Sequence, residues 1–346
     1  DGKEVQHDRL EEAGLSIDDL AVQQLITLTS QILRFPRHLS QHTGGFVLTK
    51  GPLSRMVPIE NASMKNRTVI EWDKDDLDAV GLLKVDCLAL GMLTAIRKSL
   101  AFISDRKGYT FEMQDIPDED VPTYDMICKA DTVGVFQIES RAQMASLLRT
   151  LPETLDDLTI QVAIVRPGPI QGGAVNPYIA RKQAMREDPD YVVPYEHPAL
   201  REVLQDTLGT IIFQDQVIEV AMVFAGFSPG EAEGLRRAMS RKRSEAAIRA
   251  YHERFVEGAM RTHGASAEVA QRVYEMIVGF SGFGFPKAHG AAFGLLAYQS
   301  TWLRVHYGPE FLSALLDEQP MGFYPPDALI HEAQRRGIAV VAPDVN

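Results

Sequence analysis

A lysine and an aspartate two residues apart, Lys84 and Asp86, stand in a short apolar run, where their spacing suits phosphate and metal chemistry. The composition of this run predicts a strand over Leu82–Leu88, and alternate side chains of a strand share one face. Lys84 and Asp86 would then lie on the same side, with Val85 and Cys87 turned into a core. A carboxylate holds a hard cation through oxygen, and an ammonium neutralises phosphate charge. The alternative is an ordinary ion pair at the surface end of a strand.

A second candidate group is a run of basic residues at the end of a helix that is predicted to begin at Ser228. Five of the eight residues from 236 to 243 are basic, namely Arg236, Arg237, Arg241, Lys242 and Arg243. Cations near a helix C-terminus interact favourably with the helix dipole, which is one explanation. Contact with phosphates is the other, because this density of positive charge occurs in a chain with a net charge of −12. Composition leaves both open.

The segment 280–290, FSGFGFPKAHG, carries a third group: Phe283, Lys287 and His289. It precedes a long apolar helix predicted over Ala291–Val305, so an aromatic ring could stack on a base while the lysine and histidine contact a phosphate. The segment lacks the third glycine of a dinucleotide fingerprint and the Gly-Lys-Ser/Thr ending of a P-loop. An aromatic corner of the core is therefore an equally open interpretation.

The elements that would position these residues change in character along the chain. The front of the chain predicts a helix over Ser16–Leu33 and a small sheet from strands over Phe46–Thr49, Thr68–Trp72 and Leu82–Leu88. From about Leu90 the pattern is mainly helical, with one further strand predicted over Thr132–Ile138. We therefore expect an α+β chain with its strands near the front.

Arg166 belongs to a turn rich in proline and glycine at 163–170. Its guanidinium would either bind a phosphate or brace the turn. The chain opens on aspartate, and residues 340–346 have the pattern of a strand that is ending, so we interpret the sequence as a piece of a longer protein.

Composition limits the class of protein. The 346 residues are 45% hydrophobic and 24% charged, as in ordinary globular proteins. There is no run of 18 apolar residues, which argues against a membrane span. The two cysteines have no metal-ligand spacing, which fits a cytoplasmic protein. The negative net charge argues against a general polyanion binder, so any contact with a polyanion should be confined to a groove and sensitive to salt.

Seven separated motifs, in one order along almost the whole chain, closely resemble the alpha subunit of bacterial DNA polymerase III, the C-family polymerases. They are HLSQHTGGFVL, WDKDDLDAVGLLKVDCLAL, VGVFQIESR, VRPGPIQGG, FQDQV, LRRAMSRKR and FGFPKAHGAAF. The wording of HLSQHTGGFVLTKG, IEWDKDDLDA and FQDQV looks most like the second, error-prone alpha-type polymerase of damage-induced mutagenesis. A replicative alpha subunit is the alternative within the family.

This resemblance implies part of a nucleotidyltransferase-like palm sheet followed by a large, mainly helical fingers domain. Residues 1–36 would end a thumb-like helical region, 37–91 would form the second part of the palm, and 92–346 the fingers. Asp86 matches the third metal-binding aspartate of the palm, and Lys84 matches the lysine that faces the incoming triphosphate. The other two aspartates form an Asp-x-Asp in a segment that this chain does not contain. The Asp-x-Asp spacings within residues 73–78 stand in the wrong place, and we expect solvated turn residues there.

The resemblance also assigns the fingers residues. Arg236 and Arg237 match arginines near the nucleotide phosphates, while Lys287 and His289 match a segment that closes over the nucleotide. His289 would contact a phosphate or donate a proton to the leaving group. Phe283 occupies a position where the replicative members carry tyrosine, so it keeps the ring and loses the hydroxyl. DNA contacts would come from Arg166, Arg241, Lys242 and Arg243.

The implied activity is DNA-directed DNA polymerisation, in which two Mg²⁺ ions assist nucleotidyl transfer from a dNTP to a primer 3′-OH on primer-template DNA. A sliding clamp and accessory mutagenesis proteins would bind through regions outside this piece, and the piece alone would be inactive. Two alternatives lie outside this class of enzyme. One is a DNA- or nucleotide-binding module without chemistry. The other is a metal-dependent phosphoesterase that uses the acidic segment Glu71–Asp78 with His42.

Overall fold

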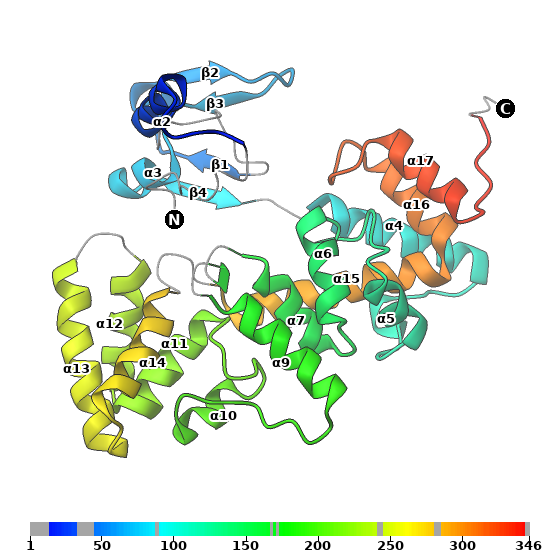
Figure 1. Ribbon diagram of the computed structural model, residues 1–346. Helices are drawn as coiled ribbons and strands as arrows, with labels where there is room; N and C mark the ends of the chain where they lie inside the picture. The colour runs from blue at the N-terminus through cyan, green and yellow to red at the C-terminus, as the bar shows by residue number, and fades with distance from the viewer. Residues whose placement is uncertain are drawn as a thin grey trace. The chain divides into compact units, whose positions relative to one another are not determined.

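The computed structural model describes residues 14–32, 45–86, 90–166, 169–170, 173–240, 245–279 and 285–342. The chain divides into two compact units, Asp1–Leu88 and Ala89–Asn346. Figure 1 shows the elements of both units, which are described separately below.

The described part of the first unit contains two helices, a short 3-10 turn and two separate antiparallel strand pairs. Strand β1 (Gly45–Leu48) pairs with β4 (Leu83–Asp86), and β2 (Ile59–Asn61) pairs with β3 (Thr68–Ile70). The remaining elements are α2 (Leu20–Ile32), the 3-10 turn η1 (Leu53–Arg55) and α3 (Lys74–Val80).

The expectation of one small sheet from three strands is wrong for the middle strand. β3 does not join β1 and β4; it pairs with β2, a three-residue strand that the sequence pattern did not predict. The turn between β2 and β3 closes locally, with Asn66 at a φ of 63° and the N–H of Arg67 donating to the carbonyl of Met64 at 3.3 Å. Pairing across so short a loop costs little chain entropy.

The first helix begins later than the sequence predicts. The carboxylate of Asp19 accepts the N–H of Ala21 at 2.8 Å, so α2 starts at Leu20 rather than at Ser16. Four of the large apolar residues spaced along α2 are exposed, and Val22 is the one buried residue of this helix. The exposed residues are Leu20, Leu25, Leu28 and Ile32.

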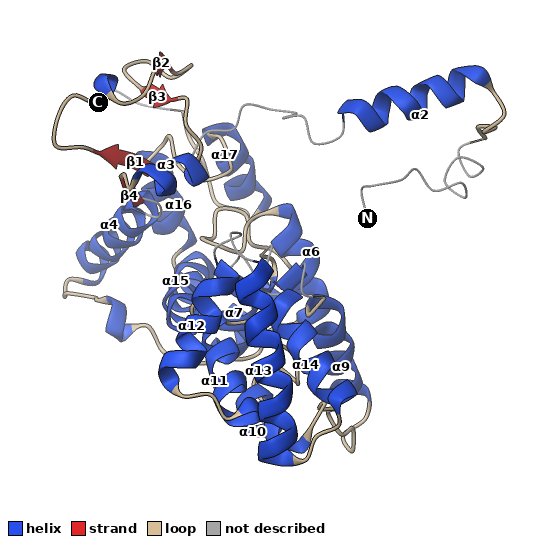
Figure 2. Cartoon of the chain, turned by 90° about the vertical axis from the view of Figure 1, so that its left-hand side faces the viewer, coloured by secondary structure: helices blue, strands red, loops and turns tan. Residues whose placement is uncertain are grey.

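The described part of the second unit is helical and contains no strand, as Figure 2 shows. Its helices are α4 (Leu90–Lys107), α5 (Val121–Cys128), α6 (Arg141–Thr150), α7 (Leu155–Ile164), α9 (Val175–Glu187), α10 (Arg201–Leu204), α11 (Gln214–Ala225), α12 (Pro229–Ser240), α13 (Glu245–His263), α14 (Ala267–Gly279), α15 (Lys287–His306), α16 (Gly308–Asp317) and α17 (Pro326–Arg335), with 3-10 turns η2 (Met113–Asp115) and η3 (Pro198–Leu200).

Helix α15 is a central element of this unit. Its buried residues, among them Tyr298, Trp302 and Leu303, belong to one hydrophobic core with residues of α4, α16 and α17. At its other end it packs closely on α7, because Gly290 and Gly294 present no side chain to the backbone of Thr159. A second core lies among α11, α12, α13 and α14.

The strand prediction for Thr132–Ile138 is wrong. Residues Thr132–Ile138 form consecutive turns, in which Gly134 and Gln137 have φ angles of 73° and 66°. Such positive φ values are incompatible with an extended strand. The segment is nevertheless buried, and the hydroxyl of Thr132 donates to the carbonyl of Ile138 at 2.6 Å. The described residues at 340–342 also form no strand.

Candidate nucleotide-binding site

The strand pair β1–β4 carries the palm candidates. Across the pair, Asp86 is opposite Gly45 and Lys84 is opposite Val47. Lys84 is exposed. The side chain of Asp86 lies outside the described residues, as does Cys87.

The opposite face of this pair is not the core that the sequence predicts. Val85 is half-buried, but Leu83 is 58% exposed. Leu48, opposite Leu83, and Phe46, opposite Val85, are 55% and 48% exposed, so this face is only partly covered.

The acidic segment after β3 forms the start of α3, so the expectation of a turn is wrong. Asp73 and Asp76 cap this helix reciprocally: the N–H of Asp76 donates to Asp73 at 2.9 Å, and the N–H of Asp73 donates to Asp76 at 3.2 Å. Within the described residues no group of three or more His, Cys, Asp or Glu side chains could hold a metal ion. His42 and the side chains of Asp75 and Asp78 lie outside them.

In the second unit, α12 presents the two predicted arginines. The helix begins as predicted, because Ser228 and Glu231 form a capping box: each accepts the backbone N–H of the other, at 3.3 Å and 2.8 Å. The helix then carries Glu233, Arg236 and Arg237. The carboxylate of Glu233 contacts both guanidiniums.

Lys287 is the first residue of α15, rather than part of the loop that the sequence predicts before the helix. Its ammonium pairs with Asp206 at 2.8 Å, and its backbone N–H donates to Asp215 of α11 at 2.7 Å. These side chains are accessible: the exposed fractions of Lys287 and Asp206 are 48% and 56%. The hydrogen bond to Asp206, acting against partial burial, raises the pKa of Lys287, which stays protonated.

Asp215 relates Lys287 to the α12 arginines. The pKa of Arg236 is raised mainly by its hydrogen bond to Glu233, and the negative charge of Asp215 adds to this shift. The pKa of Glu219 is raised mainly by the burial of its own side chain and, second, by the negative charge of Asp215. Asp215 thus holds the backbone of Lys287 and makes a minor contribution to the electrostatic field at Arg236.

His289 lies in an aromatic group on the next part of α15. Its ring centroid is 5.0 Å from that of Phe285 and 4.1 Å from that of Phe293, and Phe293 in turn contacts Phe136 at 5.2 Å. Partial burial, together with the charge of Arg166, lowers the pKa of His289. The imidazole is therefore neutral near pH 7.

Arg166 joins this aromatic group to Gln137, which lies in the turns of Thr132–Ile138. Its guanidinium donates to the side-chain oxygen of Gln137 at 3.0 Å and lies over the ring of Phe285, 5.2 Å from the centroid. Burial lowers the pKa of Arg166, which still remains charged. These contacts are those of a bracing residue; its contact with DNA stays a prediction.

The structure therefore joins Arg236 and Arg237 through Glu233 and pairs Lys287 with Asp206 and Asp215. It also groups His289 with Arg166 around Phe285. Phe283, Arg241, Lys242 and Arg243 lie outside the described residues. Sequence reasoning missed the acidic partners. Glu233 could have been found from its spacing, three and four residues before the arginines, whereas Asp206 and Asp215 meet Lys287 only through the tertiary fold.

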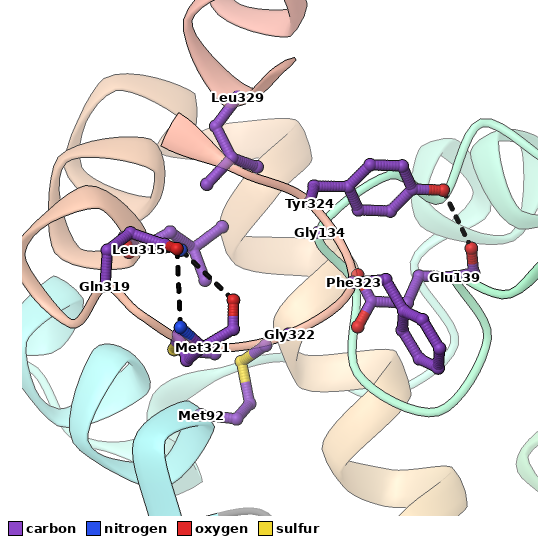
Figure 3. A pocket seen from close by; sticks show the side chains of 10 residues that line it. All are labelled: Met92, Gly134, Glu139, Leu315, Gln319, Met321, Gly322, Phe323, Tyr324 and Leu329. Atoms are coloured by element: carbon purple, nitrogen blue, oxygen red, sulfur yellow. Dashed lines mark hydrogen bonds between the residues drawn. The ribbon is translucent and has the colours of Figure 1, made fainter. Parts of the chain in front are cut away.

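A small cavity lies elsewhere in the second unit, between residues 134–139 and the connection from α16 to α17 (Figure 3). It has a volume of about 10 Å³, room for one water molecule. Among its lining residues is Glu139, which is 5% exposed, and burial raises the pKa of this carboxyl to about 7. The hydroxyl of Tyr324 donates to the backbone carbonyl of Glu139 at 2.9 Å.

Comparison with known families identifies both units. Residues 92–263 match the finger domain of the bacterial DNA polymerase III alpha subunit, and residues 2–89 match the domain described as the bacterial DNA polymerase III alpha NTPase domain. The chain belongs to the bacterial DNA polymerase III alpha subunit family, as its motifs indicate.

The similar curated proteins are named error-prone DNA polymerase. One from Teredinibacter turnerae is 53% identical over 338 residues, covering 98% of this chain and 32% of that protein. One from Methylococcus capsulatus is 50% identical over 339 residues, and one from Alkalilimnicola ehrlichii is 49% identical over 345 residues. These alignments cover 98% and 100% of this chain, and 32% and 33% of the two relatives. The chain thus spans about a third of the length of the curated relatives it matches. No helix of the described part is long and apolar enough to span a membrane.

Proposed function

We propose that this chain is the part of an error-prone DNA-directed DNA polymerase that supplies the second portion of the palm and the fingers. The observation that carries the proposal is the pair Arg236 and Arg237, held by Glu233 within the residues that match a polymerase finger domain, together with the exposed Lys287 at the start of α15. Cations at helix α12 and at the first turn of α15 suit an incoming triphosphate, because basic side chains stabilise the charge that develops on the leaving pyrophosphate.

The palm contribution rests on Asp86 and Lys84. Asp86 ends strand β4 opposite Gly45, and Lys84 stands two residues before it. Asp86 would be one ligand of Mg²⁺, and Lys84 would contact the triphosphate. Bound Mg²⁺ would lower the pKa of the attacking 3′-OH and balance charge on the phosphates. The further carboxylates needed for two metals would come from outside this chain.

The fingers residues would hold the substrate rather than react with it. Arg236, Arg237 and Lys287 would orient the triphosphate. His289, being neutral, would donate or accept one hydrogen bond at a phosphate oxygen without adding charge. Arg241, Lys242 and Arg243 would contact the DNA backbone together with Arg166. The expected partners are primer-template DNA and dNTP.

The error-prone class is favoured over a replicative role because the three relatives above carry that name at 49–53% identity across nearly the whole chain. The division between the units at Leu88 also supports a palm-to-fingers boundary near residue 91. Clamp and accessory mutagenesis contacts would belong to other parts of the full-length protein.

The test is Mg²⁺-dependent primer extension by the full-length protein that carries this chain, with Asp86→Asn beside wild type and primer-template binding measured in the same samples. We expect extension to collapse in the variant while DNA binding survives. Equal extension by both proteins would make Asp86 structural, and DNA binding without extension by either would favour a binding module. The 346-residue chain alone should not extend a primer, because one carboxylate cannot hold two metal ions.

A further inference from the structure

Glu233 contacts two arginines at once. Its Oε2 accepts the Nε–H of Arg236 at 2.8 Å and its Oε1 accepts an Nη2–H of Arg236 at 2.7 Å, a bidentate pair. Oε1 also accepts the Nε–H of Arg237 at 2.8 Å. These charge-assisted contacts keep the pKa of Glu233 at about 2, so the carboxylate is ionised near neutral pH.

Helix geometry shows why such an anchor matters. Consecutive residues of an α-helix point about 100° apart, and neighbours at i and i+1 do not face each other. Arg236 and Arg237 would therefore diverge, and their like charges would repel. Glu233 stands three and four residues earlier, on the face between them, and draws both guanidiniums toward one side of α12.

The anchor does not consume the binding capacity of the pair. Glu233 takes only one of the five N–H donors of Arg237, whose side chain is 72% exposed. A phosphate can approach Arg237 without displacing the carboxylate. The side chains of Arg236 and Glu233 are 27% and 33% exposed, so the bidentate pair is partly shielded from water.

We propose that Glu233 is a positioning residue that orders Arg236 and Arg237 in advance for the phosphates of the incoming nucleotide. This inference rests on the proposed function. An arginine side chain loses considerable rotamer freedom when it is fixed, and fixing it before the ligand arrives lowers the cost of binding. Glu233 touches neither substrate nor metal and acts through the arginines.

The experiment compares Glu233→Gln, Glu233→Asp and Glu231→Gln in the full-length protein, measuring kcat, KM for dNTP and Kd for primer-template. Glu231 is the matched control, because it lies on the same helix and stabilises its start without contacting Arg236 or Arg237. We expect Glu233→Gln to raise KM for dNTP roughly tenfold with less than a twofold change in kcat and in Kd for DNA, a loss of ground-state binding. Glu233→Asp, which keeps the charge, should fall between wild type and Glu233→Gln.

An unchanged or lowered KM in Glu233→Gln would overturn the proposal, the latter by showing that Glu233 competes with the phosphates. An equal rise in Glu231→Gln would also overturn it, because α12 stability would then explain the effect. The variant Arg236→Ala separates a failure of the positioning role from a failure of the proposed function. If it raises KM while Glu233→Gln does not, only the positioning role fails; if the wild-type protein extends no primer, the proposed function fails first.

Discussion

Asp215 accepts a hydrogen bond from the backbone N–H of Lys287, with 2.7 Å between Oδ2 and N. A second bond runs in the opposite direction, from the N–H of Gln214 to the carbonyl of Phe285 at 3.1 Å. Pro286, the residue before α15, has no side chain that can cap the helix, so the cap is supplied by α11. The FQDQV segment at the start of α11 and residues 285–287 at the start of α15 are therefore held together by two hydrogen bonds.

Asp215→Ala should lower the free energy of unfolding by about 1 kcal/mol, because loss of an N-terminal cap typically costs ~0.5–2 kcal/mol. Urea denaturation measures it. Asp206→Ala is the control: it removes an exposed ion pair with Lys287, worth ~0–1 kcal/mol, and leaves the cap intact. A larger loss in Asp206→Ala than in Asp215→Ala would show that the cap is not the stabilising contact.

Arg304 should be among the residues whose loss is most damaging to stability. Its side chain is fully buried in α15 and pairs with Asp131 and Glu332 while donating to the carbonyl of Val133. Arg304→Met leaves those partners without a buried cation, and we expect a loss of about 3 kcal/mol in the free energy of unfolding.

The control for Arg304→Met is Arg272→Met, which removes a surface pair with Glu196, their side chains being 53% and 36% exposed. That variant should lose less than about 1 kcal/mol in the same urea titration. Similar losses in the two variants would mean that the buried network contributes no more than a surface pair.

Glu139 predicts a dependence of stability on pH. Burial raises its pKa from 4.5 to about 7, although the N–H of Gly134 and the charge of Arg304 oppose this. The folded state binds the proton more tightly than the unfolded chain does, so this contribution is fully present below pH 4.5 and is lost as the pH rises through 7. At 1.36 kcal/mol for each pKa unit, the upper limit is about 3 kcal/mol.

Glu139→Gln has no proton to lose. The stability difference between this variant and wild type should therefore move in favour of the variant by ~1–3 kcal/mol between about pH 5 and pH 8. Urea titrations at four pH values, with the exposed Glu202→Gln as control, measure this shift. A difference that stays constant with pH would contradict the raised pKa.

Gly258 should not tolerate a side chain. A Cβ at this position of α13 would overlap the carbonyl of Ala225 at the end of α11, so the two helices would have to separate. We expect Gly258→Ala to lower the melting temperature by several degrees through overpacking, which costs ~1–3 kcal/mol. Gly230→Ala, with open space around it in α12, should be neutral or slightly stabilising. Equal melting temperatures for the two variants would refute the close approach.

Local signals predicted part of this fold well. The capping box of Ser228 and Glu231 predicted the start of α12, because both partners are within one turn of sequence. The same kind of reasoning was wrong for Thr132–Ile138, where β-branched residues indicated a strand. There, positive φ angles at Gly134 and Gln137 and a side-chain hydrogen bond from Thr132 override the local preference.

The candidate site shows the same division between local and tertiary information. Arg236, Arg237, Lys287 and His289 were named from the sequence. Their carboxylate partners were not, since Asp206 reaches Lys287 across 81 residues of chain. The apolar face of β4 was expected to lie in a core, because alternation places apolar and polar side chains on opposite faces of a strand. Alternation alone does not show whether another element covers the apolar face.

Helix α15 has a consequence for genetics. Its first turn carries Lys287 and His289, and the same continuous helix of 20 residues, about 30 Å long, buries Arg304 near its other end. A screen for inactive alleles would therefore recover substitutions of both kinds from this one helix, and loss of activity alone would not sort them. Protein abundance in each allele would separate a lost contact with the nucleotide from a lost core.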